Sequence, residues 1–110
     1  GVYSHMKIIE TTVFTKKLRA LLPDEVYREL QNELVLNPGK GRVITGSGGL
    51  RKIRWNIPGK GKSGGVRIIY YWVKKKDILL MLLIYAKNEQ DNLTSVQLKT
   101  LKTLIEKEFK

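Results

Sequence analysis

The stretch VRIIYYWVKKKDILLMLLIY, residues 66–85, decides the fold. Two runs rich in branched and aromatic residues, Val66–Val73 and Ile78–Tyr85, are joined through Lys74-Lys75-Lys76-Asp77. Such runs favour β-strands, and a short polar connection between them favours antiparallel pairing. Residues 78–84 are apolar throughout, as expected of a strand with helices over both of its faces. The segment therefore predicts the centre of a sheet.

A third strand is predicted at Leu50–Ile57, before the loop PGKGKSGG at residues 58–65. Successive side chains of a strand point to opposite faces, so Lys52 and Arg54 share one face. The other face carries apolar side chains: Ile53, Trp55 and Ile57. By the same rule, Tyr70 and Trp72 lie on the face opposite Arg67. The three strands form an antiparallel meander.

Helices are predicted before and after this meander in the sequence. A short strand at Lys7–Thr12 precedes one or two helical turns with apolar positions Phe14, Leu18 and Leu21. A second helix begins at Pro23, has its apolar face at Val26, Tyr27, Leu30 and Leu34, and ends before Asn37-Pro38-Gly39. A third begins with the capping-box pattern Thr94-x-x-Gln97. Its apolar stripe is Leu98, Leu101, Leu104, Ile105 and Phe109.

The predicted fold class is α+β: a small antiparallel sheet packed with N-terminal helices and a C-terminal helix. A chain of 110 residues fits one domain, which we place at residues 6–110. Residues 1–5, GVYSH, precede Met6 and resemble a cloning remnant.

Composition excludes several kinds of chemistry. The chain has no cysteine, and its one histidine lies in the remnant, so disulfides, thiol catalysis, the usual zinc sites and imidazole catalysis are not expected. We predict no metal and no cofactor. The apolar runs are far shorter than the roughly 20 residues that span a bilayer. We therefore expect a cytoplasmic protein with no membrane partner.

The positive charge is concentrated in one segment. The formal net charge is +11, from 21 basic and 10 acidic residues. Residues 37–76 hold no acidic residue and 11 basic ones, which leaves 10 of each sign elsewhere: Lys40, Arg42, Arg51, Lys52, Arg54, Lys60, Lys62, Arg67, Lys74, Lys75 and Lys76. A charge block of this density indicates a phosphate-bearing partner, and nucleic acid is the first expectation.

Within this block, Lys52, Arg54 and Arg67 lie on adjacent predicted strands, and Lys87 follows the last strand. Cations on one sheet face can converge on a phosphate, for binding alone or for catalysis. The string Gly59-Lys60-Gly61-Lys62-Ser63 is not a Walker A loop, because its first glycine is missing and a strand follows. Aromatic side chains near these cations can stack on unpaired bases, and Tyr71 is the best placed of them.

Three segments resemble the RelE and ParE superfamily of bacterial type II toxins, and within it the HigB branch. They are GGLRKIR at 48–54, KGKSGGVRIIYY at 60–71 and IYAKNE at 84–89. The resemblance implies a RelE-like microbial RNase fold and a toxin that cleaves messenger RNA in the ribosomal decoding site, with 16S rRNA contacts. It further implies attack by the ribose 2′-hydroxyl without a metal, and neutralisation by an antitoxin, commonly a HigA-like helix-turn-helix protein.

The resemblance also implies the site residues. Lys52, Arg54, Arg67 and Lys87 match the basic catalytic positions, and we expect Arg51, Lys60, Lys62, Tyr71 and Tyr85 to bind RNA. RelE carries a tyrosine where this sequence has Thr94, so the choice of general base between Lys52 and Lys87 stays open. A ParE-like inhibitor of DNA gyrase and a non-catalytic nucleic-acid-binding module are the alternative functions.

Overall fold

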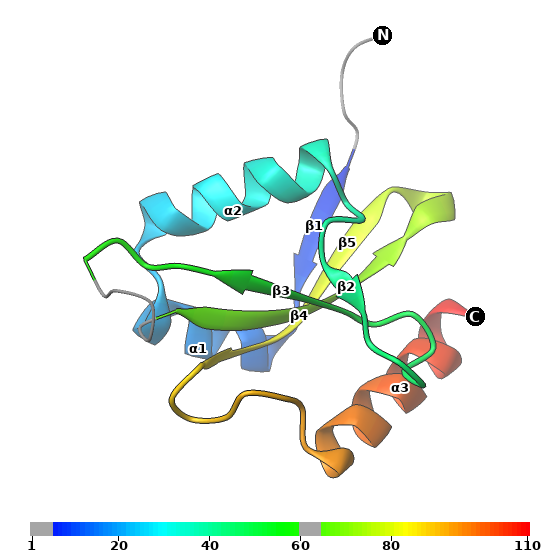
Figure 1. The fold of residues 1–110 in the computed structure, drawn as a ribbon. Coiled ribbons are helices and arrows are strands. Elements are labelled where there is room, and N and C mark those ends of the chain that lie inside the picture. The colour runs from blue at the N-terminus through cyan, green and yellow to red at the C-terminus, as the bar shows by residue number, and fades with distance from the viewer. Residues whose placement is uncertain (1–5, 60–64) are drawn as a thin grey trace, which may run out of the picture.

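The computed structural model describes residues 6–59 and 65–110 as a five-stranded sheet between helices (Figure 1). The strand order is β1-β5-β4-β3-β2. The elements run β1 (Lys7–Glu10), α1 (Thr12–Leu21), α2 (Asp24–Leu36), β2 (Arg42–Val43), β3 (Arg51–Trp55), β4 (Val66–Val73), η2 (Lys74–Lys76), β5 (Ile78–Ala86) and α3 (Ser95–Phe109). The α+β class predicted from the sequence is confirmed.

The predicted meander β3-β4-β5 is antiparallel throughout, and one strand is added on each side of it. β1 pairs with β5 in parallel, from Lys7 opposite Ile78 to Glu10 opposite Met81. β2 is a two-residue edge strand antiparallel to β3 that the sequence pattern did not predict. The sheet is therefore wider than the predicted meander, and β4 lies at its centre.

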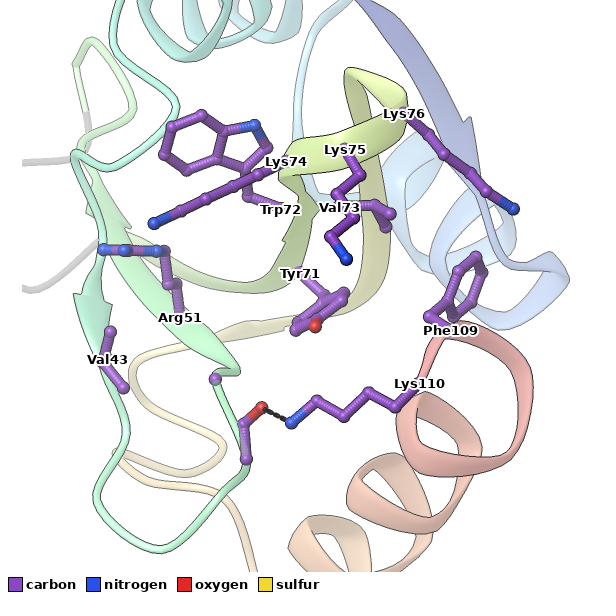
Figure 2. Close-up of a pocket in the computed structure, with 12 residues that line it drawn as sticks. Val43, Arg51, Tyr71, Trp72, Val73, Lys74, Lys75, Lys76, Phe109 and Lys110 are labelled. Carbon is purple, nitrogen blue, oxygen red and sulfur yellow. Dashed lines mark hydrogen bonds between the residues drawn. The ribbon is translucent and has the colours of Figure 1, made fainter.

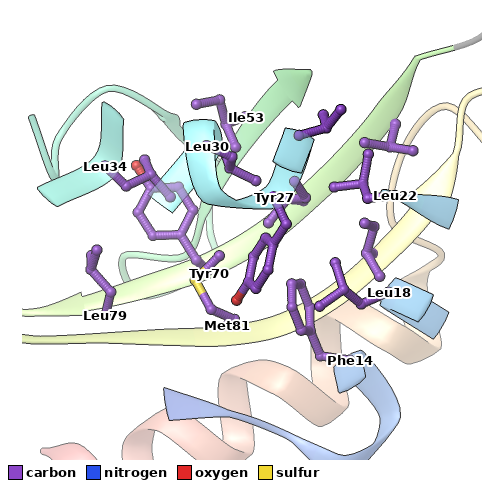
Figure 3. Packing of buried hydrophobic residues seen from close by; sticks show 14 residues of the cluster. Phe14, Leu18, Leu22, Tyr27, Leu30, Leu34, Ile53, Tyr70, Leu79 and Met81 are labelled. Carbon is purple, nitrogen blue, oxygen red and sulfur yellow. The ribbon is translucent and has the colours of Figure 1, made fainter. Parts of the chain in front are cut away.

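Helices α1 and α2 cover one face of the sheet, and their apolar side chains pack on those of the strands (Figure 3). Phe14, Leu30 and Tyr70 are fully buried in this cluster. Glu10 ties the layer together, because its carboxylate accepts hydrogen bonds from Tyr27 Oη and Thr15 Oγ1, each at 2.7 Å. Helix α1 has ten residues, more than the one or two turns predicted, and Thr11 caps its first turn.

The C-terminal helix α3 covers the opposite face with a second apolar cluster that includes Leu50, Ile69 and Ile105. The capping box predicted at its start is present: Thr94 Oγ1 accepts from Gln97 N, and Gln97 Oε1 accepts from Thr94 N. Within the described residues, no helix has the length and apolarity that a membrane span requires.

A β-bulge shifts the register between β4 and β5. Ile69 pairs with Leu83 but Tyr70 pairs with Met81, so Leu82 has no partner on β4. Leu82 and Leu83 both contribute to the cluster under α3. The hydroxyl of Thr11 donates to the Leu82 carbonyl oxygen at 2.9 Å, so the residue that caps α1 also stabilises the bulge.

Tyr70 fixes the loop that leads to the edge strand β2. Its hydroxyl donates to Pro38 O at 2.7 Å and accepts from Gly41 N at 2.8 Å. A side chain at position 41 would approach Tyr70 Cε1 to 2.7 Å, so glycine is required there. These contacts hold residues 38–41 against the sheet.

Replacing Tyr70 with Phe should lower the free energy of unfolding by about 1 to 3 kcal/mol, because two backbone groups lose their partner. Urea denaturation followed by circular dichroism measures the change. Tyr71→Phe is the matched control, since no hydrogen bond of the Tyr71 hydroxyl is found among the described residues, and it should cost less than about 0.5 kcal/mol. Equal losses in the two variants would contradict the anchoring role of Tyr70.

Candidate functional site

Two arginines and a tyrosine form a row across three neighbouring strands. Arg54 of β3 pairs with Arg67 of β4, and Arg67 pairs with Tyr85 of β5. Their neighbours along the strands, such as Ile53 and Ile84, belong to the cluster under α1 and α2, so the row lies on the α3 side of the sheet. Adjacent strands are about 4.8 Å apart. The register therefore brings these groups close enough to act on one ligand.

Arg67 is buried, with 6% of its surface exposed, and its donors are only partly satisfied. Nη2 lies 3.3 Å from Asp91 Oδ1, on a side chain that is itself 60% exposed. Nε of Arg67 and the hydroxyl of Tyr85 are buried and have no hydrogen-bond partner among the described residues. Buried polar atoms are normally paired, so these two donors mark a place where an anion would bind.

Burial raises the pKa of Tyr85 above the ordinary tyrosine value, although the charge of Arg67 acts in the opposite direction. The hydroxyl therefore keeps its proton near neutral pH and can donate a hydrogen bond.

Lys52 lies on the same face as Arg54, two residues before it on β3. Its Nζ donates to Asn92 Oδ1 at 2.8 Å. Burial lowers the pKa of Lys52 below the ordinary lysine value, and the charge of Arg54 lowers it further. Asp91 opposes these effects. The lysine thus loses its proton more easily than one free in water, as a general base requires.

A cleft of about 460 Å³ lies beside Lys52 and Arg54 at the edge of the sheet, and we call it the edge cleft. Its lining has no acidic residue: Lys40, Arg42, Val43, Ile44, Lys52, Ile53 and Arg54. Lys40 lies over the ring of Trp55, 5.9 Å from its centroid, and pairs with Glu33 at 2.8 Å. The lining therefore carries positive charge next to the row.

Two other predicted site residues, Lys87 and Tyr71, lie outside the row. Lys87 is exposed just after β5, where its backbone N–H donates to Gly65 O at 3.0 Å beside the start of β4. Tyr71 lies on the Arg67 face, as predicted, but four residues along β4, where it packs against Phe109.

Arg51 also lies outside the row. Its Nη1 donates to Gly39 O and Gly41 O at 3.1 and 2.8 Å, which gives it a structural contact with the loop before β2. Lys60 and Lys62 lie outside the described residues. RNA binding by Arg51, Lys60 and Lys62 stays a prediction.

Sequence reasoning missed Asp91 and Asn92, which contact Arg67 and Lys52 from the segment between β5 and α3. The one available signal was an acidic residue shortly after the strand that carries Tyr85. Among the described residues, no group of three or more His, Cys, Asp or Glu side chains gathers as a metal site would.

The sequence model of a protein family, described as the RelE toxin of the RelE/RelB toxin–antitoxin system, matches residues 6–110. This chain belongs to the RelE toxin family. Solved structures agree in fold. A mutant of the Escherichia coli toxin RelE in the free state has 14% identity and a TM-score of 0.60, over 90% of this chain and 95% of that one. A chain of the intact E. coli RelBE toxin–antitoxin complex has 20% identity and a TM-score of 0.52, over 74% and 95%.

Within the RelE framework, Thr94 has a clear structural role. Its side chain caps α3, and its backbone N–H meets Gln97 Oε1 at 3.0 Å. A tyrosine could not supply the short hydroxyl that this cap requires. The aromatic side chain of the row is Tyr85, on β5.

Asp91→Asn should lower the pKa of Lys52 further, because the Asp91 carboxylate is the charge that raises it. An NMR titration of the Lys52 Cε and Nζ resonances measures this directly. Asp24→Asn, on α2, is the charge-matched control and should leave the titration unchanged. An unchanged or raised pKa in Asp91→Asn would show that Asp91 does not act on the site as described.

Proposed function

We propose that this RelE-family protein is a ribosome-dependent endoribonuclease that cleaves messenger RNA in the decoding site and so inhibits translation. The row Arg54–Arg67–Tyr85 is the observation that carries the proposal, because it sets two forked cations beside a buried phenol. Arginine forks match the geometry of phosphate oxygens. The edge cleft, with four cations and no acidic lining residue, supports an RNA strand as the ligand.

Binding of RNA should exchange one anion for another at Arg67. In the free protein the Asp91 carboxylate contacts Nη2 at 3.3 Å, longer than the 2.7 to 2.9 Å typical of a strong charged hydrogen bond. A phosphodiester carries a single negative charge, as a carboxylate does, but it presents several acceptor oxygens, whereas Asp91 contacts Arg67 through one oxygen only. It can also reach the unpartnered donors, Arg67 Nε and the Tyr85 hydroxyl. We infer that the scissile phosphate displaces Asp91 from Arg67.

The chemistry that this arrangement supports is transfer of the phosphoryl group to the neighbouring ribose oxygen. Lys52, in its neutral form, takes the proton of the 2′-hydroxyl, and the 2′-oxygen attacks the adjacent phosphorus. Arg54 and Arg67 stabilise the extra negative charge on the five-coordinate phosphorus. The bond to the 5′-oxygen then breaks, and that oxygen takes a proton from Lys87. The products are a 2′,3′-cyclic phosphate and a 5′-hydroxyl.

Lys52 is the better candidate for the base, and Lys87 for the acid. Lys52 lies on the same sheet face as the row, and its lowered pKa makes the neutral form easier to reach. Lys87 is exposed to solvent just after β5, two residues after Tyr85, so the amine left after it has given up a proton can take another from water. The sequence alone leaves these two lysines equivalent.

The same proposal includes a protein partner and a location. The E. coli RelE structure in a RelBE complex is bound to an antitoxin, and the family is defined by such a system. We infer that a cognate antitoxin neutralises this chain; a HigA-like helix-turn-helix protein is the type that the sequence resemblance favours. Cleavage in the decoding site places the protein in the bacterial cytoplasm, in contact with 16S rRNA.

Arg67→Ala and Arg54→Ala should each reduce messenger RNA cleavage on ribosomes by about 100- to 1,000-fold, the loss typical of removing one transition-state donor. Primer extension on messages in a purified translation system measures the rate. Arg28→Ala, an exposed arginine on α2, is the control and should cleave at the parental rate. Thermal denaturation verifies folding. Parental cleavage by folded Arg67→Ala would refute the assignment.

A further inference from the structure

A second cleft, of about 490 Å³, lies at the other end of β4, and we call it the lysine-turn cleft (Figure 2). Tyr71 and Phe109 line it, and so do the three lysines of the turn η2. Arg67 is four residues from Tyr71 along the strand, which corresponds to roughly 13 Å. The lysine-turn cleft is therefore separate from the row Arg54–Arg67–Tyr85.

The aromatic part of this cleft is held in place by its surroundings. The rings of Tyr71 and Phe109 lie 6.4 Å apart, tilted by 45°. A side chain at Gly49 would come within 3.1 Å of Tyr71 Cε1, and the φ of +111° there also favours glycine, so the backbone passes directly against the ring. Lys110 Nζ donates to Gly48 O at 2.6 Å (Figure 2) and joins the end of α3 to this loop.

The charge in the cleft is entirely positive. Lys74, Lys75 and Lys76 are exposed, and no acidic residue lines the cleft. Asp77, in a left-handed conformation with φ of +52°, ends the turn that presents them. Lys74 Nζ lies 5.0 Å from the centroid of the Trp72 ring. Within the described residues, none of the three lysines makes a salt bridge, so all three are available to an anion.

The two clefts share one lining residue, on the edge strand. Val43 of β2 lines both of them and is 53% exposed. An RNA strand that leaves the row through the edge cleft can therefore cross Val43 and enter the lysine-turn cleft without passing an acidic lining residue.

We propose that the lysine-turn cleft is a second binding site for the single-stranded RNA that is cut at Arg67, with a base against Tyr71 and Phe109 and phosphates on Lys74–Lys76. Aromatic side chains beside cations are how proteins hold unpaired strands without reading their sequence. Continuity with the edge cleft favours RNA over an acidic peptide. The proposal rests on the proposed function. The site holds the message at a second point, away from the scissile bond.

The triple variant Lys74→Gln, Lys75→Gln, Lys76→Gln tests this site. The probe is a fluorescent single-stranded RNA of about 12 nucleotides, methylated at every 2′-oxygen so that it cannot be cut. Fluorescence anisotropy at several salt concentrations should show binding at least tenfold weaker than that of the unchanged protein. The plot of log affinity against log salt should be shallower by about 2, since three phosphate contacts on a single strand contribute roughly 0.7 each.

The matched control is Lys16→Gln, Lys17→Gln, Arg19→Gln, which removes the same three charges from exposed positions on α1. It should change affinity less than twofold. A probe of about 3 nucleotides, too short to reach both sites, should bind both triple variants alike.

Three results would overturn the proposal. They are equal affinity of the two triple variants for the long probe, a loss for the short probe in the lysine-turn variant as large as its loss for the long probe, or a loss in that variant of binding to a glutamate-rich peptide alone. A protein that binds the long probe through η2 but never cleaves messages would instead refute the proposed function and leave this site standing.

Discussion

Arg67 is a charged side chain that the sheet buries, and the rest of the site depends on how its charge is satisfied. Removing a guanidinium group from water is unfavourable unless its donors meet acceptors. The contacts found are a long one to Asp91 at 3.3 Å and a marginal one to the Val66 carbonyl at 3.5 Å, while Nε is unpaired among the described residues. The free protein thus carries an electrostatic cost that a phosphate can offset. In our account, this difference between the free and bound states provides the affinity for RNA.

The position of Arg67 beside Tyr85 depends on the bulge in β5. Tyr71 pairs with Leu80, and an unbroken register from that pair would bring Ile84 opposite Arg67. The unpaired Leu82 shifts the pairing by one residue, so Tyr85 lies there instead. Thr11 binds the Leu82 carbonyl while it caps α1. The N-terminal helix layer and the position of Tyr85 in the row are therefore coupled through one threonine.

Much of this arrangement follows from the sequence, because alternation and capping are local. The shared face of Lys52 and Arg54, the opposite face of Tyr70 and Trp72, and the capping box of α3 were all predicted correctly. The two-residue β2 and the bulge were not, since neither has a periodic signal of its own. Asp91 and Asn92 reach partners 24 and 40 residues away, and such contacts depend on the path of a loop that no local pattern encodes. The roles of Lys52, Arg54, Arg67 and Lys87 in catalysis stay predictions.

The most direct measurement of the central claim is to map the ends of messages in ribosomes stalled by the purified protein, together with the chemistry of those ends. The account predicts new 3′ ends within the decoding site that carry a 2′,3′-cyclic phosphate, with 5′-hydroxyl groups on the downstream fragments. Intact messages, together with an altered supercoiling of plasmid DNA, would contradict it and favour inhibition of gyrase on the same fold.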